Sequence, residues 1–310
     1  MTRRHFLEVD DLSPEELTAV LDLSEGKVSR VLTDRGVAMI FEKPSLRTRN
    51  STEMAVVQLG GHPVYIQNDE ITLDVRERTE DAIRVLEGYY DIICARVFKH
   101  HQLERMAAVA DVPIVNLLSE AGHPVQALAD LLTIRQCFGN VAGLQMTWVG
   151  DFSNVAFSLG IGLAMLGASS IFSCPKGYGP VEESLDRMRR VATGSASIRV
   201  DTHPSSAVVG SHIISTDAWY SMGQEAEKEV RKRAFEGFRV DTAMMALALP
   251  DAIFLHCLPA HRGEEVTDEV IDSVQSKVFA QAHNRMHTMR GLFSWFHGQG
   301  SIPTYSGVVQ

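Results

Sequence analysis

Cysteines are scarce in this sequence, and no two of them stand close together. The four occur at Cys94, Cys137, Cys174 and Cys257, without a CxxC pair. Disulfide frameworks and zinc knuckles need cysteines in closely spaced sets. We therefore expect reduced thiols in a cytoplasmic protein.

Positive charge is also in short supply. Lys and Arg number 29 against 39 Asp and Glu, which gives a net charge of -10, and neither sign forms a long run. A nucleic-acid-binding protein normally presents a basic face to the phosphates. The composition therefore argues against a nucleic-acid partner.

Long apolar runs are almost absent. The first residues, MTRRHFLEVDD, turn acidic before the apolar core of a signal peptide could form. The uncharged stretch 155–174 approaches the about 20 residues that span a bilayer, but glycines at Gly160, Gly162 and Gly167 interrupt it. We interpret it as a buried helix, a turn and a strand, and expect no membrane partner.

Short apolar runs alternate with amphipathic segments of helical length. The runs predict strands at 37–41, 63–66, 92–95, 113–116, 145–149, 170–173, 212–215 and 252–256. The segments predict helices at 13–24, 48–59, 79–89, 102–109, 125–138, 154–166 and 181–192. This alternation is typical of doubly wound α/β folds, in which ligands bind beyond the carboxyl ends of parallel strands.

The chain is long for one domain. Its 310 residues exceed the usual domain length of about 100 to 150, so we expect two doubly wound parallel-sheet domains. The predicted domains are 1–138 and 139–285, joined by hinge helices. A C-terminal helix at about 286–298 is expected to return to the first domain, followed by a tail, 299–310.

The segment 42–53 follows the first apolar strand and opens a helix. Ser45, Arg47, Thr48 and Arg49 place hydroxyls and guanidiniums around the first helical turn. That turn has free backbone N–H groups and the positive end of the helix dipole. Arginine also grips phosphates and carboxylates through paired hydrogen bonds. The segment therefore predicts an anion site.

Other polar groups follow later strands. Arg96 ends the strand at 92–95, and His123 and Gln126 stand three residues apart at a helix start. They offer a cation, an imidazole and an amide to one ligand. When these two residues are considered alone, the commoner arrangement is that His123 caps its helix and Gln126 lies on the surface.

In the second half, Asn154 closes a strand and opens a helix, where it either binds an anion or caps the helix. A dinucleotide site is not predicted, because the GxGxxG spacing is absent and Asp151 stands where a phosphate-facing glycine belongs. The carboxylate of Asp217 and the hydroxyl of Ser221 suit an ammonium group, and the exposed backbone N–H groups nearby suit a carboxylate. An amino acid has both groups.

The segment 254–264 places His256, Cys257 and His261 beyond the last strong strand, and His283 and His287 stand at i, i+4. We expect no metal there, since adjacent residues seldom reach one ion and no second cysteine follows at ligand spacing. A cysteine nucleophile is possible, but His256 in a strand would point away from Cys257.

In this order the motifs resemble the aspartate/ornithine carbamoyltransferase (transcarbamylase) family. Its Ser-x-Arg-Thr-Arg, Ala-Arg-Val and His-Pro-x-Gln motifs match 45–49, 95–97 and 123–126. The Asp-x-Trp-x-Ser-Met-Gly loop and His-Cys-Leu-Pro strand end of the ornithine enzymes match 217–223 and 256–259. The match runs from about residue 6 to residue 296, nearly the whole chain. Aspartate relatives would lack the Ser-Met-Gly loop and the cysteine, and acetylornithine relatives also lack the loop, so free ornithine is favoured.

The resemblance implies that carbamoyl phosphate and L-ornithine give L-citrulline and phosphate by direct attack of the neutral δ-amine, without metal or organic cofactor. It implies that the first domain binds carbamoyl phosphate and the second binds ornithine. Catalytic roles are implied for Arg47, Thr48, Arg96, His123, Gln126, Cys257 and Arg285. Carbamoyl phosphate would contact these residues and also Ser45, Leu46 and Leu258. Ornithine would contact Asn154, Asp217, Ser221 and Met222. The family also implies a homotrimer or a multiple of trimers.

Several positions depart from the family pattern. Leu46 replaces a common Thr, and Ser153 replaces a usual Asn. Asp74, Arg78 and Ala82 stand where ornithine enzymes commonly have Gly, Ser and Thr, in a loop that usually reaches a neighbouring subunit's site.

Two alternatives remain open. One is a carbamoyltransferase for another amine, such as putrescine or a modified ornithine. Asp217 and Asn154 argue against a diamine, which has no α-carboxylate. The other is a noncatalytic regulatory paralogue, against which the intact catalytic set argues.

Overall fold

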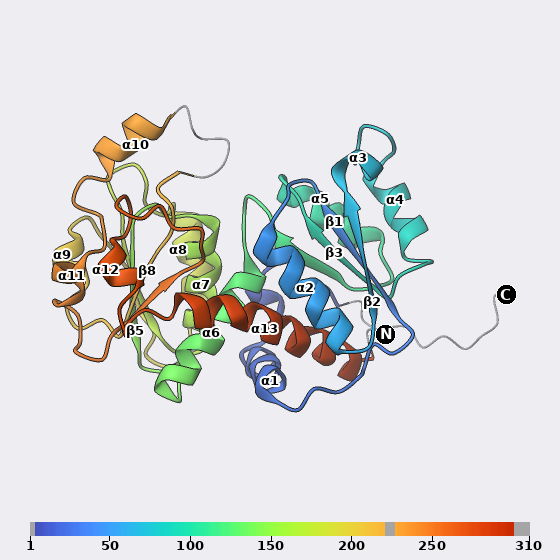
Figure 1. Ribbon diagram of the computed structural model, residues 1–310, viewed down its shortest axis with the longest axis horizontal. Helices are drawn as coiled ribbons and strands as arrows, with labels where there is room; N and C mark the ends of the chain where they lie inside the picture. Colours follow the sequence, from blue (N-terminus) through green and yellow to red (C-terminus); the bar gives the residue numbers. More distant parts are fainter. Residues whose placement is uncertain (1–3, 221–226, 301–310) are drawn as a thin grey trace. The chain divides into compact units, whose positions relative to one another are not determined.

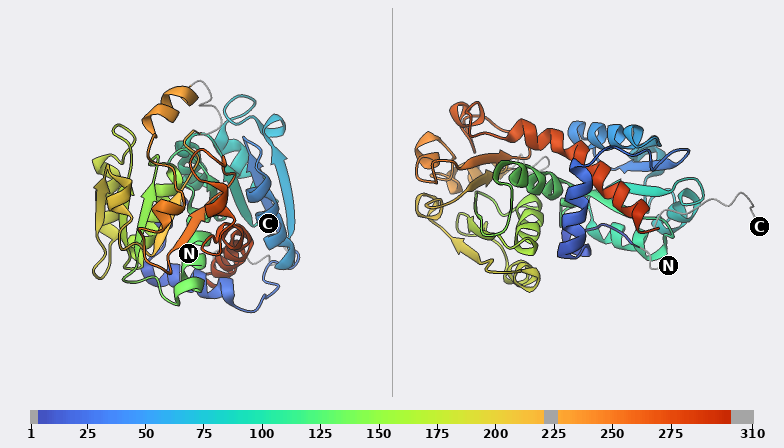
Figure 2. Two further views of the ribbon diagram at one scale, coloured as in Figure 1. Left: turned by 60° about the vertical axis from the view of Figure 1, so that its left-hand side comes forward. Right: turned by 90° about the horizontal axis from the view of Figure 1, so that it is seen from below.

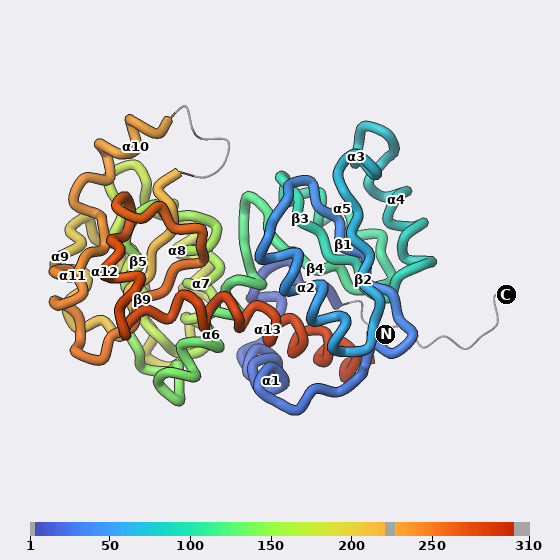
Figure 3. Tube along the Cα trace, viewed as in Figure 1, coloured from blue at the N-terminus to red at the C-terminus, as the bar shows by residue number. Residues whose placement is uncertain are grey.

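The computed structural model describes residues 4–220 and 227–300 and contains two compact units (Figure 1). The first unit combines the chain up to Leu128 with the chain from Arg285 onward, and the second is Ala129–Asn284. The chain therefore leaves the first unit within α6 (Pro124–Phe138) and returns to it within α13 (Val278–Gly298), as can be followed in Figure 3.

A four-stranded parallel sheet forms the centre of the first unit, in the order β2-β1-β3-β4. Its strands are β1 (Gly36–Phe41), β2 (His62–Gln67), β3 (Ile92–Arg96) and β4 (Ile114–Leu118). Its other elements are η1 (Val9–Asp11), α1 (Pro14–Glu25), α2 (Leu46–Gln58), α3 (Asn68–Ile71), α4 (Thr79–Leu86) and α5 (His100–Val109). Strand β3 is buried along its whole length, as expected for an inner strand with helices on both faces.

Different helices cover the two faces of this sheet. Ile83 of α4 and Leu103 of α5 join Ile40 and Ile93 of the sheet in one buried cluster. Helix α2 lies beside α13, a pairing seen in both Figure 1 and Figure 2. Arg290 of α13 donates to Gln58 of α2 at 2.8 Å.

Helix α13 also approaches α1 very closely, at Gly291. A Cβ atom at Gly291 would lie only 2.1 Å from Ser24 Oγ and 2.4 Å from the carbonyl oxygen of Val20. Both neighbours belong to α1. No side chain fits at this crossing, so the glycine sets how closely the two helices pack.

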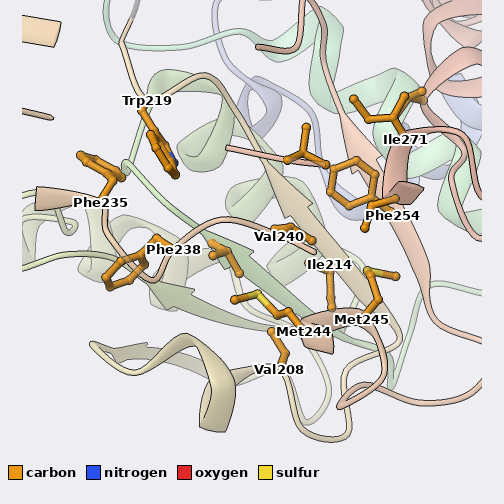
Figure 4. Close-up of a cluster of buried hydrophobic side chains, with 14 of the residues drawn as sticks. Val208, Ile214, Trp219, Phe235, Phe238, Val240, Met244, Met245, Phe254 and Ile271 are labelled. Carbon is orange, nitrogen blue, oxygen red and sulfur yellow. The ribbon is translucent and has the colours of Figure 1, made fainter. Parts of the chain in front are cut away.

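The second unit has a five-stranded parallel sheet in the order β7-β6-β5-β8-β9. Its strands are β5 (Gln145–Val149), β6 (Ser169–Ser173), β7 (Ile198–Asp201), β8 (Ile213–Thr216) and β9 (Ile253–His256). Its helices include α7 (Asn154–Met165), α8 (Glu182–Val191), α9 (Pro204–Ala207), α10 (Lys228–Ala234), α11 (Thr242–Met245) and α12 (Asp268–Ile271). An aromatic-rich cluster of buried side chains in this unit includes Trp219, Phe235 and Phe254 (Figure 4).

The predicted α/β fold with two parallel sheets is confirmed. The eight predicted strands are all present, with ends that differ by at most two residues. Strand β7 was not predicted, because the four residues Ile198–Asp201 are only partly buried and carry two charges. The stretch 155–174 forms α7, a turn and β6 as expected. Within the described parts of the chain, no helix is both long and apolar enough to cross a membrane.

Candidate functional site

The turn from β1 into α2 places the predicted anion motif at a helix start. Ser45 is the N-cap, and its hydroxyl accepts a hydrogen bond from the backbone N–H of Thr48 at 3.4 Å. The first turn of α2 contains no acidic side chain that would oppose an anion. Leu46 is 74% exposed, so its side chain leaves the backbone of this turn accessible.

The two arginines of the motif lie in different settings. Arg49 is placed over the ring of Tyr65 at 3.9 Å and pairs with Glu53 at 3.4 Å. Arg47 is half-buried and makes no hydrogen bond or ion pair with any other residue that the structure describes. Of the two guanidiniums, that of Arg47 is the one left available to an anion.

Arg285 is the centre of a buried polar cluster in the first unit, which we call the Arg285 cluster. Its Nη2 donates to Thr48 Oγ1 at 2.9 Å, and its Nη1 donates to Gln126 Oε1. The same Nη1 lies 3.5 Å from His123 Nε2. Thr48, His123, Gln126 and Arg285 are each at most 5% exposed. The cluster therefore joins the starts of α2 and α6 to α13.

His123 is held neutral within this cluster. Burial lowers the pKa of its imidazole well below the ordinary value, and the charges of Arg285 and Arg96 lower it further. An arginine can only donate, so Nε2 accepts and the ring proton lies on Nδ1. The alternative in which Gln126 is a surface residue is wrong, because Gln126 is 1% exposed and bonded to Arg285.

Arg96 is the last residue of β3 and is 8% exposed. The pairing of β3 with β4 shifts register between Ala95 and Arg96, so the strand is irregular where this guanidinium emerges. Its backbone carbonyl accepts from the N–H of Glu42, which anchors the segment before α2 to the end of β3. Arg96 and the segment that opens α2 therefore lie at the carboxyl ends of the neighbouring strands β3 and β1.

In the second unit, the strand ends carry Asn154, Asp217 and Cys257. The cap of α7 is Ser153, whose hydroxyl accepts from Ala156 N at 3.4 Å, so Asn154 is the first helical residue and not the cap. Ser153 Oγ also lies 3.4 Å from Asp217 Oδ2. Cys257 Sγ donates to Asp217 Oδ1 at 3.2 Å. Asp217 therefore connects the loops after β5, β8 and β9. The predicted residues Ser221 and Met222 lie outside the described residues.

His256 has a structural role beside Cys257. Its Nδ1 accepts from the N–H of Leu258 at 2.9 Å, and its Nε2 lies 3.2 Å from Glu265 Oε1. Gln281 accepts from the backbone N–H of His256 at 3.0 Å. Leu258 has a φ of 58°, in the left-handed region that side chains rarely adopt. These contacts hold the chain in that shape directly after Cys257.

Two groups of potential metal ligands occur in the described part of the chain, each with ligand atoms within 4.8 Å of one another. The first is Asp217, His256 and Cys257, but both ring nitrogens of His256 already have protein partners. The second is His261, Glu264 and Glu265. Glu264 there accepts from Tyr220 and pairs with Lys232 at 2.8 Å, so a cation would have to displace a lysine. The pair His283 and His287 is also unsuited, since His287 Nδ1 accepts from Arg290.

The loop that departs from the family pattern is tied to its own unit. Asp74 has a φ of 62°, which accounts for the glycine common in relatives, and aspartate is among the residues that tolerate this region. Its carboxylate binds Arg105 at 2.6 and 2.9 Å and accepts from Thr79 N at 3.1 Å. The Arg105 hydrogen bonds lower the pKa of Asp74 to about 2. Arg105 also pairs with Glu80 at 2.7 Å.

Sequence reasoning missed the buried guanidinium of Arg231 on α10. Its Nη1 donates to Asp151 Oδ2 at 2.8 Å and to the carbonyl oxygen of Trp219 at 2.9 Å, and its Nε donates to Glu227 Oε2 at 3.0 Å. In the sequence, Asp151 is only a mismatch to a glycine motif. Its partner stands 80 residues away in the sequence, and no spacing rule links the two.

Two domain models of one protein family match the chain. Residues 4–136 match the carbamoyl-P binding domain of aspartate/ornithine carbamoyltransferases, and residues 142–296 match the Asp/Orn binding domain. The chain belongs to the aspartate/ornithine carbamoyltransferase family. The predicted family resemblance is therefore confirmed, and with it the assignment of the protein as a carbamoyltransferase enzyme.

Individual relatives agree with this assignment. The curated ornithine carbamoyltransferase of Acidothermus cellulolyticus is 46% identical over 299 residues, which cover 94% of this chain and 96% of that protein. The solved ornithine carbamoyltransferase of Pyrococcus furiosus has a TM-score of 0.92 at 41% identity, covering 96% of this chain and 99% of its own. A solved acetylornithine transcarbamylase complexed with acetylcitrulline has a TM-score of 0.85 at 29% identity, covering 94% and 98% of the two chains. The fold alone therefore does not select the amine.

Proposed function

We propose that the enzyme transfers the carbamoyl group of carbamoyl phosphate to the δ-amine of L-ornithine, forming L-citrulline and phosphate. The observation that carries the proposal is the Arg285 cluster together with Arg47 at the start of α2, whose guanidinium has no partner among the described residues. The names of the curated relatives and the Asp217–Cys257 pair support ornithine as the acceptor.

The first unit supplies groups for the donor substrate. Ser45, the backbone of Leu46, Arg47, Thr48 and Arg96 bind the phosphate. Thr48 and Arg96, with the Nδ1–H of neutral His123, are aimed at the carbamoyl oxygen. Negative charge grows on that oxygen as the amine attacks, and then on the leaving phosphate. Donors and cations fixed in advance stabilise this charge without reorganising.

Gln126 and Arg285 hold each other in place through a hydrogen bond. Gln126 Oε1 already accepts from Arg285, which holds the amide with its NH2 group directed away from that bond. The amide and the second guanidinium nitrogen orient the carbamoyl group. Because Thr48, Gln126 and Arg285 are buried, their hydrogen bonds act in a medium where electrostatic interactions are stronger than in water.

The second unit supplies groups for the acceptor. Asn154 and the main chain at Met222 bind the ornithine carboxylate, while Asp217 and Ser221 bind its α-ammonium. The δ-amine attacks only when neutral, although a free alkylammonium has a pKa of about 10.4. Cys257 contacts the δ-amine and positions it, and the departing phosphate accepts the proton.

The active assembly is a homotrimer or a multiple of trimers, and the enzyme works in the cytoplasm without a metal or organic cofactor. Light scattering tests the assembly. A fully active monomer would contradict it.

One assay separates this function from the two alternatives. Carbamoyl phosphate is incubated with ornithine, acetylornithine, putrescine and aspartate, and both phosphate release and carbamoylated product are measured. Citrulline formation with ornithine as the best acceptor is expected. A higher kcat/KM for another amine would establish a different carbamoyltransferase, and no product with any amine would favour the noncatalytic paralogue.

A further inference from the structure

Arg231 joins two loops that carry opposite ends of the proposed acceptor site. Asp151 lies between β5 and Asn154, and Trp219 lies two residues after Asp217. One nitrogen of the guanidinium, Nη1, contacts both loops, at 2.8 Å to Asp151 and 2.9 Å to the Trp219 carbonyl. Arg231 is only 8% exposed, so water does not compete freely for these bonds.

Further contacts hold the guanidinium in place. It lies 5.1 Å from the centre of the Tyr178 ring, and the carbonyl of Tyr178 accepts from Phe152 N at 2.9 Å. The indole of Trp148 donates to the Asp151 carbonyl at 2.8 Å. The loop before Asn154 is therefore fixed from both sides. The backbone carbonyl of Trp219 accepts a hydrogen bond from the same guanidinium. The centre of the Trp219 ring lies 5.6 Å from the centre of the Phe235 ring (Figure 4).

The charges in this region explain why an arginine is needed. Burial raises the pKa of Asp151, and the nearby carboxylate of Asp217 raises it further. Among the described residues, Arg231 pairs with the carboxylates of Asp151 and Glu227 and not with that of Asp217. The carboxylate of Asp217 is left to attract a cation, while Asp151 is held as a structural partner.

We propose that Arg231 is a positioning residue that sets the distance between the carboxylate-binding Asn154 and the ammonium-binding Asp217. This inference rests on the proposed function and extends it, because it assigns the selection of α-amino acids to the spacing of two loops. A planar guanidinium can donate hydrogen bonds to two loops and to Glu227 at once. The ammonium group of a lysine lacks this planar arrangement of donors.

The test compares Arg231→Gln and Arg231→Lys with Arg233→Gln, a matched control from an exposed position on the same helix. Both Arg231 variants should raise the KM for ornithine by at least about tenfold, as expected for lost hydrogen bonds to charged groups. The KM for carbamoyl phosphate, whose proposed phosphate-binding residues lie in the first unit, should stay within about twofold, as should both KM values of Arg233→Gln. Binding of 2-aminopentanoate, which has the same α-carbon groups but no δ-amine, should weaken in parallel with the ornithine KM.

A double-mutant cycle with Asp151→Asn adds a second readout. The two substitutions remove the same contact, so their effects on the ornithine KM should not be additive. An unchanged ornithine KM in both Arg231 variants, or an equal rise in both KM values, would overturn the inference. If the wild-type enzyme forms no citrulline, the proposed function itself fails, which is a separate outcome.

Discussion

Each unit contains a buried arginine, but the two arginines have partners of opposite character. Arg285 contacts Thr48, Gln126 and the neutral His123, and none of these three side chains carries a negative charge. Arg231 contacts the carboxylates of Asp151 and Glu227, so its charge is neutralised. The same side chain thus serves as an electrostatic group in the first unit and as a structural connection in the second.

This difference accounts for how one chain distinguishes its two proposed substrates. An arginine that contacts neutral side chains suits an anionic substrate such as the proposed carbamoyl phosphate. A neutralised arginine leaves the nearby Asp217 carboxylate to attract the ammonium of an amino acid. The partners of each arginine, and not the presence of an arginine, decide which charge the unit binds.

The largest effect is expected from removing the cations of the first unit. Arg47→Ala or Arg96→Ala should lower citrulline-forming turnover by at least about 100-fold, the usual loss for one transition-state donor. Arg49→Ala provides a comparison within the same motif, because that guanidinium lies over Tyr65, and it should cost far less. Steady-state kinetics decide the point. Near-normal turnover in the Arg47 or Arg96 variant would remove that residue from the site.

A smaller effect is expected from the carboxylate of the second unit. Asp217→Asn should raise the ornithine KM about tenfold through the loss of a charge-assisted bond, and should leave the carbamoyl phosphate KM unchanged. Asp186→Asn, on the exposed face of α8, is the matched control. If the two KM values rise together, the assignment of one substrate charge to each unit is wrong.

The neutral His123 predicts a pH dependence of stability. Its pKa in the folded protein lies well below that of the unfolded chain, about 6.5, so below that pH only the unfolded chain gains this proton. The free energy of unfolding should therefore fall as the pH drops below about 6.5, by up to about 1.4 kcal/mol per pH unit from this residue.

Replacing His123 by Gln removes that titration. The free energy of unfolding, measured with urea between pH 5 and pH 7, should then decline less steeply, by the slope that about one proton contributes. His101→Gln, at an exposed position of α5, controls for the loss of an imidazole. An identical decline in the His123→Gln variant and the wild type would show that His123 is not held neutral.

The smallest effect is expected at Asp74. Asp74→Gly relieves a left-handed backbone but removes an exposed pair with Arg105, and these opposing changes should leave stability within about 1 kcal/mol. Urea unfolding measures the change. A larger loss would give this loop a stabilising role comparable to that of the buried arginines.

The sequence predicted most of the fold because period-2 and apolar patterns are local signals. It also identified the β1–α2 motif, since Ser45, Arg47 and Thr48 stand together in the chain. It did not find the contacts of Arg231, because Asp151 and Trp219 come to it only through the folding of separate strand ends. Strand β7 was missed for a different reason, since a half-exposed edge strand of four residues has no strong hydrophobic pattern.

The discontinuity of the first unit has a consequence for synthesis. A ribosome delivers Ser45, Thr48, His123 and Gln126 long before Arg285, which is the 285th of 310 residues. The second unit is continuous in the sequence and can fold while the chain is still growing, because domains generally fold as units during synthesis. A nascent chain that stops before α13 therefore lacks Arg285, so an incomplete product is left without one of the groups proposed to orient the carbamoyl donor.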